Sequence, residues 1–322
     1  MKPRLSLATL LAWGIVATLF SACVLAARGA ETPAAKGTKD TDALAELEKA
    51  KAKVAPTYRL AYQQKAGDSL RTRVVHLATV ETKIKGVAQS TKSRTVSTRL
   101  WKIRDVDAAG NITFDHSVER VEMWNSVEGR QEVHYDSADG MTPPAEFSTV
   151  AATVGKVLAT IKIDPHGRIL ERNNAQAQFN PGIGEVTIPF PNIPVKAGNT
   201  WSIPDELKLP LEDGTIKKIQ TRQQYKLEKV EAGVATITLQ TQVLTPINEP
   251  KVQSQLVQRL QRGTIKFDLD AGRLIHKQLD MDQAVFGFNG EDSHMQYLAR
   301  FTEEPVGEEK TAKTAQVGET KR

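Results

Sequence analysis

Three short blocks of residues occur twice in the chain in the same order, and this internal repeat limits the possible folds more than any other feature. The matching blocks are Lys65–Ser69 with Lys196–Thr200, Val106–Gly110 with Val230–Gly233, and Ile161–Leu170 with Ile265–Ile275. Each pair shares its turn residues, so we expect the second half of the body to repeat the supersecondary structure of the first. Two copies are too few for a solenoid, which leaves a pair of sheets or one curved sheet.

Apolar and polar residues alternate with a period of two between these blocks. The segments Val96–Ile103 and Val234–Leu239 show this alternation and are rich in β-branched residues, which is typical of strands. Glycine-containing turns separate the strands at residues 107–110, 164–167, 231–233 and 270–272. The sequence therefore predicts a series of antiparallel hairpins.

Each copy also has one segment with helical spacing, immediately before its third block. These segments are Pro144–Leu158 and Glu249–Leu260, in which apolar residues recur every three or four positions. The expected fold is mainly β, with one or more antiparallel curved sheets built from two tandem repeats. Each repeat would carry one short amphipathic helix that covers the apolar face of a sheet.

The N-terminal segment has the composition of an export signal. Lys2 and Arg4 precede an apolar run over residues 5–27. Cleavage at the small residues that end this run and retention as a single membrane anchor both fit its length. A third possibility is lipidation at Cys23, because Phe20–Cys23 resembles a lipoprotein box. We expect an exported protein, either periplasmic or held at the membrane with its body outside the cytoplasm.

Composition and the repeat together divide the chain into five parts. The expected parts are a signal peptide or anchor (1–27), a flexible tether with a short helix (28–56), a first β repeat (57–175), a second β repeat (176–302) and a disordered tail (303–322).

The sequence lacks the motifs of the common enzyme classes. It has no nucleophile elbow, phosphate-binding loop or dinucleotide fingerprint, and none of the six histidines forms an HExxH motif. The single cysteine, Cys23, excludes a disulfide framework and a cysteine-based zinc site. We therefore expect no catalytic residues, no metal and no cofactor, although a hydrolase with an unrecognised site remains an alternative. The small net charge of +5 gives no reason to expect a nucleic-acid partner.

Charge is distributed unevenly along the first repeat. Residues 65–104 contain ten basic and two acidic residues, whereas residues 105–146 contain ten acidic and two basic residues. The turn at residues 107–110 would fold the second stretch back beside the first. We therefore expect ion pairs between neighbouring strands rather than a surface that binds polyanions.

Five residues are candidates for binding. Trp101, Trp201 and Phe190 could contact a ligand, although packing in the core or on the sheet face explains them without one. Arg168 and Arg273 each follow the turn glycine of a matching block and could form a paired anion site, or could make structural ion pairs at strand starts.

Several of the turn and strand markers also resemble those of a known family. The segments Lys196–Trp201, Val230–Ile237, Gly263–Asp268 and Gly272–Leu274 look like those of exported bacterial proteins in a family without assigned function. The resemblance covers residues 57–302. It implies a β-rich domain of the cell envelope and transfers no catalytic residue.

The leading functional hypothesis is a non-enzymatic envelope domain that binds a lipid or other hydrophobe, a glycan, or another envelope protein on a curved sheet. The alternative is a membrane-anchored structural or assembly partner. In that case the proline-rich connector 183–195 would either join the repeats or serve as an edge that the partner contacts. An apolar cavity larger than packing voids would favour the first hypothesis.

Overall fold

The computed structural model describes residues 55–175, 186–211 and 214–307. All of them belong to the second of two units into which the chain divides, Ala55–Arg322. The expected signal or anchor with Cys23, the tether as far as residue 54, and the tail beyond residue 307 lie outside the described residues. Within the described part of the chain, no helix has both the length and the apolar character needed to span a bilayer.

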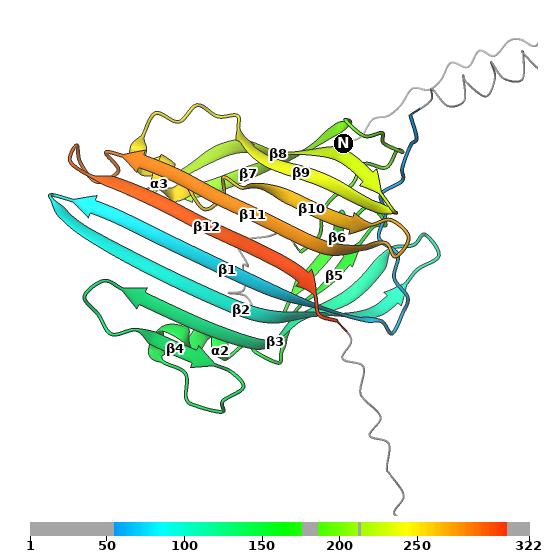
Figure 1. Cartoon of the computed structure of the whole chain (residues 1–322), viewed down its shortest axis with the longest axis horizontal. Coiled ribbons are helices and arrows are strands. Elements are labelled where there is room, and N and C mark those ends of the chain that lie inside the picture. The colour runs from blue at the N-terminus through cyan, green and yellow to red at the C-terminus, as the bar shows by residue number, and fades with distance from the viewer. Residues whose placement is uncertain (1–54, 176–185, 212–213, 308–322) are drawn as a thin grey trace, which may run out of the picture. The chain divides into compact units, whose positions relative to one another are not determined.

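Twelve antiparallel strands form a single sheet (Figure 1). Along the sheet the strands follow the order β6-β5-β3-β2-β1-β12-β11-β10-β9-β8-β7, and β4 pairs with the end of β3 that β5 does not reach. The strands are β1 (Ser69–Ile84), β2 (Val87–Val106), β3 (Ile112–Val127), β4 (Val133–Asp136), β5 (Val157–Ile163), β6 (Ile169–Asn174), β7 (Thr200–Pro210), β8 (Ile216–Glu231), β9 (Val234–Val243), β10 (Arg262–Asp268), β11 (Arg273–Phe286) and β12 (His294–Pro305). The two halves therefore share one sheet rather than forming a pair.

The first and last strands of the body lie side by side in the middle of this sheet. Val74 of β1 is opposite Glu303 of β12, and Ala78 is opposite Ala299. The edge strands are β6 and β7, and within the described residues no backbone pairing joins them. The sheet is therefore open.

One face of the sheet is buried and the other is largely polar. In β9 the residues Ala235, Ile237 and Leu239 are buried, whereas the residues between them are half-buried. This alternation is the period-two pattern of the sequence and it confirms these residues as a strand. We call the buried side the inner face and the opposite side the outer face.

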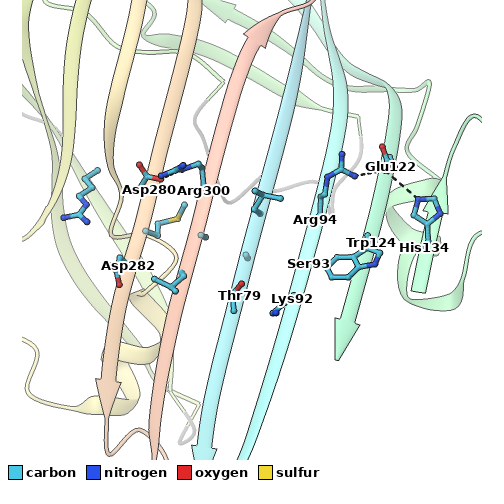
Figure 2. Close-up of a pocket in the computed structure, with 16 residues that line it drawn as sticks. Thr79, Lys92, Ser93, Arg94, Glu122, Trp124, His134, Asp280, Asp282 and Arg300 are labelled. Carbon is cyan, nitrogen blue, oxygen red and sulfur yellow. Dashed lines mark hydrogen bonds and ion pairs between the residues drawn. The ribbon is translucent and has the colours of Figure 1, made fainter. Parts of the chain in front are cut away.

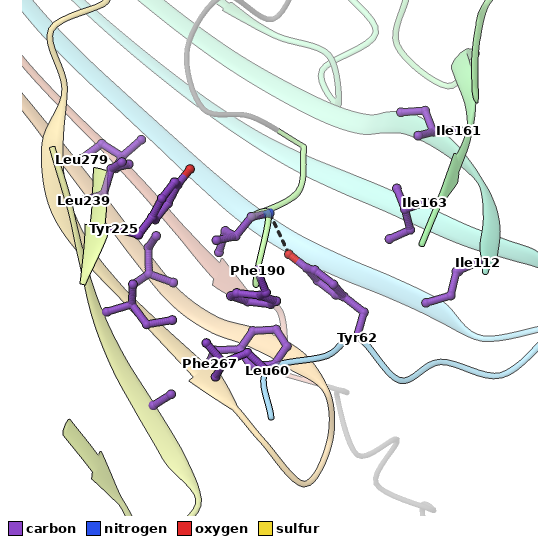
Figure 3. Close-up of a cluster of buried hydrophobic side chains, with 14 of the residues drawn as sticks. Leu60, Tyr62, Ile112, Ile161, Ile163, Phe190, Tyr225, Leu239, Phe267 and Leu279 are labelled. Atoms are coloured by element: carbon purple, nitrogen blue, oxygen red, sulfur yellow. Dashed lines mark hydrogen bonds between the residues drawn. The ribbon is translucent and has the colours of Figure 1, made fainter. Parts of the chain in front are cut away.

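Two segments outside the strands fill part of the space against the inner face (Figure 3). Leu60 and Tyr62 come from the segment before β1, and Phe190 comes from the connector before β7. The rings of Phe190 and Phe267 lie 4.7 Å apart, and those of Tyr62 and Phe190 lie 5.5 Å apart. These contacts form the centre of the largest hydrophobic core.

The segment before β1 is held by the turns within the two copies of the third matching block, Ile161–Leu170 and Ile265–Ile275. The backbone N–H of Tyr62 donates to Pro165 O (2.7 Å), and that of Gln63 donates to Gly272 O (3.1 Å). A Cβ on Gly167 would lie 2.4 Å from Ile188 O, and one on Gly272 would lie 2.4 Å from Gln63 N. Both glycines also have positive φ, +80° and +57°, so both positions require glycine.

The first predicted helix is much shorter than expected. A 3-10 turn at Ala145–Phe147 leads into a single α-helical turn, α2 (Ser148–Ala151), rather than a helix over Pro144–Leu158. Gly155 ends the helical conformation with a φ of +76°, and its N–H donates to Val118 O (2.8 Å). The last residues of the predicted helix then belong to β5. The second helix, α3 (Pro250–Leu256), lies within its predicted range and buries Val252 and Leu256.

The expected start of the disordered tail at residue 303 is too early, because β12 continues to Pro305. Residues 303–305 continue β12, and Glu303 is buried beside Lys277 with their Oε2 and Nζ atoms 2.6 Å apart. Because its partner is more than twenty residues earlier in the sequence, the local composition of the tail gives no sign of this contact.

The opposite charges of the first repeat pair between strands, as predicted. Arg94 of β2 contacts Glu122 of β3 (2.6 Å), and Arg71 of β1 contacts Glu119 of β3 (2.9 Å). These side chains lie at the surface, where each pair contributes about 0–1 kcal/mol. Their main effect is to favour the observed register.

Candidate functional site

Phe190, a predicted binding residue, belongs to the core instead. It is fully buried between Tyr62 and Phe267. The neighbouring backbone N–H of Ile188 donates to the hydroxyl of Tyr62 (2.8 Å), as Figure 3 shows. These contacts attach this part of the connector to the core, whereas Ile193 in the same connector is 64% exposed. The alternative of an edge that a partner contacts stays a prediction.

The two predicted tryptophans pack against other rings. Trp101 stacks on Phe114 with ring centres 4.2 Å apart, and Trp201 stacks on Tyr225 at 5.5 Å. The indole N–H of Trp201 donates to Pro189 O (2.9 Å) and so fixes the connector against β7. Both side chains remain partly exposed.

A cavity of about 680 Å³ opens between the two edge strands. Arg168, Ile169 and Arg172 line it from β6 and the preceding turn, while Ile203 and Leu207 line it from β7. Other parts of the wall come from the connector and from inner-face residues, among them Val186, Thr187, Pro189, Thr221, Gln223, Thr241 and Gln261. Since both edges of the sheet contribute, the sheet curls so that its edges face a common space. We call this space the inner cavity.

The inner cavity carries an excess of positive charge. Three arginines line it, Arg168, Arg172 and Arg259, and the only carboxylate among its described lining residues is that of Asp205. Within the described residues the guanidinium of Arg168 forms no ion pair, and its backbone N–H donates to Asp164 (2.9 Å). The guanidinium of Arg172 donates to the amide oxygen of Asn174 (2.9 Å), which leaves its charge uncompensated by that contact.

The positive charges of nearby arginines also act on a buried histidine of β3, His116. Burial, together with the nearby charge of Arg99 and a smaller effect of Arg172, lowers the pKa of His116 to about 4, and Glu303 partly opposes this shift. His116 is therefore neutral in the folded protein near neutral pH.

Acidification from pH 6.5 to pH 4 should destabilise the protein through His116. The unfolded chain binds a proton at this residue near pH 6.5, whereas the folded chain does not do so until about pH 4. The free energy of unfolding should fall by about 3 kcal/mol over this range, because one pKa unit corresponds to about 1.4 kcal/mol. Urea titrations of the wild type and of His116→Gln would measure it. The variant should lose most of this pH dependence, while His134→Gln, at a side chain that is 54% exposed, should retain it.

Arg273 lies at a second and smaller pocket of about 110 Å³. Trp101, Tyr62 and the buried pair Lys277–Glu303 also line this pocket. Its volume corresponds to only a few water molecules at about 30 Å³ each. Arg168 and Arg273 therefore line two different pockets that share Val186, and the structure does not bring them together as a paired anion site.

A third hollow, of about 950 Å³, lies on the outer face (Figure 2). It crosses the strands from Arg262 on β10 to His134 on β4. Leu77 and Leu298 form part of its floor, and each is 42% exposed. We call this hollow the outer depression.

Sequence reasoning found Arg168 but missed most residues of the inner cavity. Arg172, Gln223 and Thr241 belong to no motif. A signal was nevertheless present, because Gln223 shares the inner-face period of Tyr225 and Leu227 in β8. A polar residue at an inward-facing position of a strand indicates a place where the core is incomplete.

Comparisons with known proteins identify no family. No protein-family model and no curated protein matches the chain. A structure of lipid–protein interactions in lipovitellin is 11% identical with a TM-score of 0.42, and the match covers 76% of this chain but only 26% of that one. DynF of the dynemicin biosynthesis pathway of Micromonospora chersina is 7% identical with a TM-score of 0.20, covering 78% of this chain and 86% of that one. The Salmonella injectisome secretin InvG is 9% identical with a TM-score of 0.18, covering 86% and 68%.

The chain thus spans about a quarter of the length of the lipovitellin chain that it matches. All three TM-scores are below 0.5, so these similarities assign no function.

Proposed function

We propose that this protein is a binding domain whose inner cavity holds a small amphipathic ligand with an anionic group, such as a single-chain lipid. The observation that supports this is the inner cavity itself, whose volume of about 680 Å³ is within the usual range of ligand sites. It corresponds to roughly twenty water molecules at about 30 Å³ each. That space suits one hydrocarbon chain and a compact head group.

The chemistry of the cavity wall matches the two parts of such a ligand. Arg168 and Arg172 offer guanidinium groups, which bind carboxylate or phosphate through paired hydrogen bonds. Val186, Ile203 and Leu207 offer apolar surface for a hydrocarbon chain. The open edge between β6 and β7 supplies a route of entry.

The order of elements also supports the two tandem repeats expected from the sequence. The first half runs β1, β2, β3, α2, β5 and β6, with the short strand β4 inserted after β3, and the second runs β7, β8, β9, α3, β10 and β11. Both sets follow the same order across the sheet, and β12 lies between them. On this proposal the inner cavity forms where the free edge of one repeat faces the free edge of the other.

We also propose that this binding function operates in the cell envelope, because residues 1–27 have the composition of an export signal. Residues 1–27 would direct the body out of the cytoplasm or hold it at the membrane, as in the exported bacterial family that the sequence resembles. Fractionation of cells that express the full chain would test this location, and a body that stays in the cytoplasm would contradict it.

Replacing Arg168 or Arg172 with glutamine should weaken binding of an anionic amphiphile by about 10- to 100-fold, because a hydrogen bond to a charged group contributes about 1.5–3 kcal/mol. Native mass spectrometry and calorimetry with palmitate and with a palmitoyl lysophosphatidate would measure the affinity and separate carboxylate from phosphate head groups.

The matched control for these variants is Arg273→Gln. Arg273 occupies the equivalent turn position in the second repeat but lines the smaller pocket, so its replacement should leave the affinity unchanged. Monopalmitoyl glycerol, which has no charge, should bind more weakly than either anionic probe. If neither anionic probe binds the wild type, the proposed function is wrong.

A further inference from the structure

The outer depression exposes an aromatic ring and several polar groups of fixed position. Around it, the outer face carries ion pairs between neighbouring strands. The depression lies on the opposite side of the sheet from the inner cavity, so a ligand bound here would be independent of the proposed function. Seven strands contribute to it, from β10 across the middle of the sheet to β4. Figure 2 shows its charged residues in two groups, one on each side of Thr79.

Trp124 is the aromatic residue of this surface. On β3 it lies opposite Arg94 of β2 and opposite His134 of β4. Its indole N–H donates to Glu132 (3.2 Å), which fixes the orientation of the ring. Trp124 is only half-buried and lies outside every hydrophobic core of the described residues. A pyranose ring has an apolar face that packs on an indole of this kind.

Polar side chains beside Trp124 are held in place by one another. Glu122 accepts from Arg94 (2.6 Å) and lies 3.8 Å from His134 Nε2. On the other side of the depression, Arg300 pairs with Asp280 (2.6 Å). Groups that are fixed before a ligand arrives lose little conformational freedom on binding. Planar charged groups of this kind bind sugar hydroxyls with both donors and acceptors.

Two further cations, Lys92 and Arg262, line the depression. Arg262 lies opposite Asp280 of β11, and its charge helps to lower the pKa of that carboxyl. Lys92 forms no ion pair within the described residues, so it is the cation available for a ligand. Lys92 is diagonal to Trp124 across the β2–β3 pair, which places the two about 7–8 Å apart. Arg262 is five strands away from β3, or about 24 Å at 4.8 Å per strand. A negatively charged group next to a stacked ring would meet Lys92.

We propose that the outer depression binds a linear acidic oligosaccharide, with one sugar ring stacked on Trp124 and a carboxylate beside Lys92. A neutral sugar chain would leave Lys92 without a charged partner. A compact anion would not use the indole face or the length of the depression.

Calorimetry with a hexamer of galacturonic acid tests this proposal on the purified chain. The hexamer should bind the wild type, and Trp124→Ala should weaken binding by about tenfold or more, as expected for an aromatic anchor. Lys92→Gln should also weaken it and should reduce the loss of affinity between about 50 and about 200 mM salt. Trp124→Phe, which keeps an aromatic face, should retain part of the affinity.

The control variant is Phe286→Ala. Phe286 is an exposed aromatic residue, 71% accessible, that does not line the depression, so its loss should not change binding. Circular dichroism of each variant would show that it is folded. Absence of binding to the wild type would overturn the proposal, and so would binding that survives Trp124→Ala. Equal binding of maltohexaose would overturn the preference for an acidic chain.

Discussion

Replacing Lys277 with methionine should lower the free energy of unfolding by about 3–5 kcal/mol. Lys277 and Glu303 form an ion pair whose side chains are only 4% and 5% exposed. Thr72 donates a further hydrogen bond to Glu303 (3.0 Å), and the Lys277 ammonium lies 5.2 Å from the ring centre of Phe301. Loss of the lysine would leave a carboxylate in a site that water does not reach, where an uncompensated charge is costly.

The pH dependence of this variant distinguishes a charge effect from lost packing. Burial alone would raise the pKa of Glu303, but the charges of Lys277 and Arg99 outweigh it and hold the pKa below its usual value. In the wild type this stabilisation is complete above the pKa of an unfolded glutamate and is lost as the pH falls through the lower native pKa. In Lys277→Met the deficit should shrink on acidification, because protonated Glu303 carries no charge.

Urea denaturation of the single and double variants would measure these effects. The double variant Lys277→Met/Glu303→Leu should regain part of the lost stability, since it leaves no carboxylate buried without its lysine. The recovery should be incomplete because Arg99, which is also buried, loses the compensating charge of Glu303. A single variant as stable as the wild type would show that the pair contributes nothing to folding.

Replacing Phe190 with alanine should cost about 3–5 kcal/mol of stability, the usual effect of deleting a buried aromatic ring. Phe190 joins the connector to Phe267 on β10 and to Tyr62 before β1, so its loss leaves a cavity among three parts of the chain. The matched control is Ile193→Ala in the same connector. Ile193 is 64% exposed, and its replacement should change stability by less than about 0.5 kcal/mol.

Thermal and urea denaturation would compare the two connector variants. The measurement also decides between the two interpretations of Phe190 that the sequence allows. A Phe190→Ala protein that keeps its stability but loses ligand affinity would restore Phe190 as a binding residue.

Local sequence patterns predicted the strands well because the alternation that marks a strand involves only residues that are neighbours in the sequence. The alternation in Val96–Ile103 and Val234–Leu239 corresponds to parts of β2 and β9, and the turn at residues 107–110 joins β2 to β3. The prediction of a long helix over Pro144–Leu158 was wrong because the same apolar spacing fits both a helix and the end of a buried strand. The hydrogen bond from the backbone of Gly155 to β3 ends the helical conformation and favours the strand.

The parts that sequence reasoning missed depend on residues far apart in the chain. Tyr62 has no periodic neighbours, yet it lies in the core because turns more than a hundred residues away hold its backbone. The inner cavity likewise exists only where β6 and β7 face each other, so Arg168 was visible as a turn residue but its cavity was not. The pairing of opposite charges across the first hairpin, by contrast, was predicted correctly, and the Arg94–Glu122 contact is an example.

The pairing of β1 with β12 sets the order of events during synthesis. As it leaves the ribosome, β1 can pair with β2 within a few seconds, but its other edge has no partner until residues 294–305 have been made. Contacts of such long sequence separation slow folding. An exposed strand edge in the middle of the future sheet is meanwhile open to pairing with other chains. The incomplete chain is therefore the stage most prone to aggregation, and a chaperone that covers this edge of β1 would protect it.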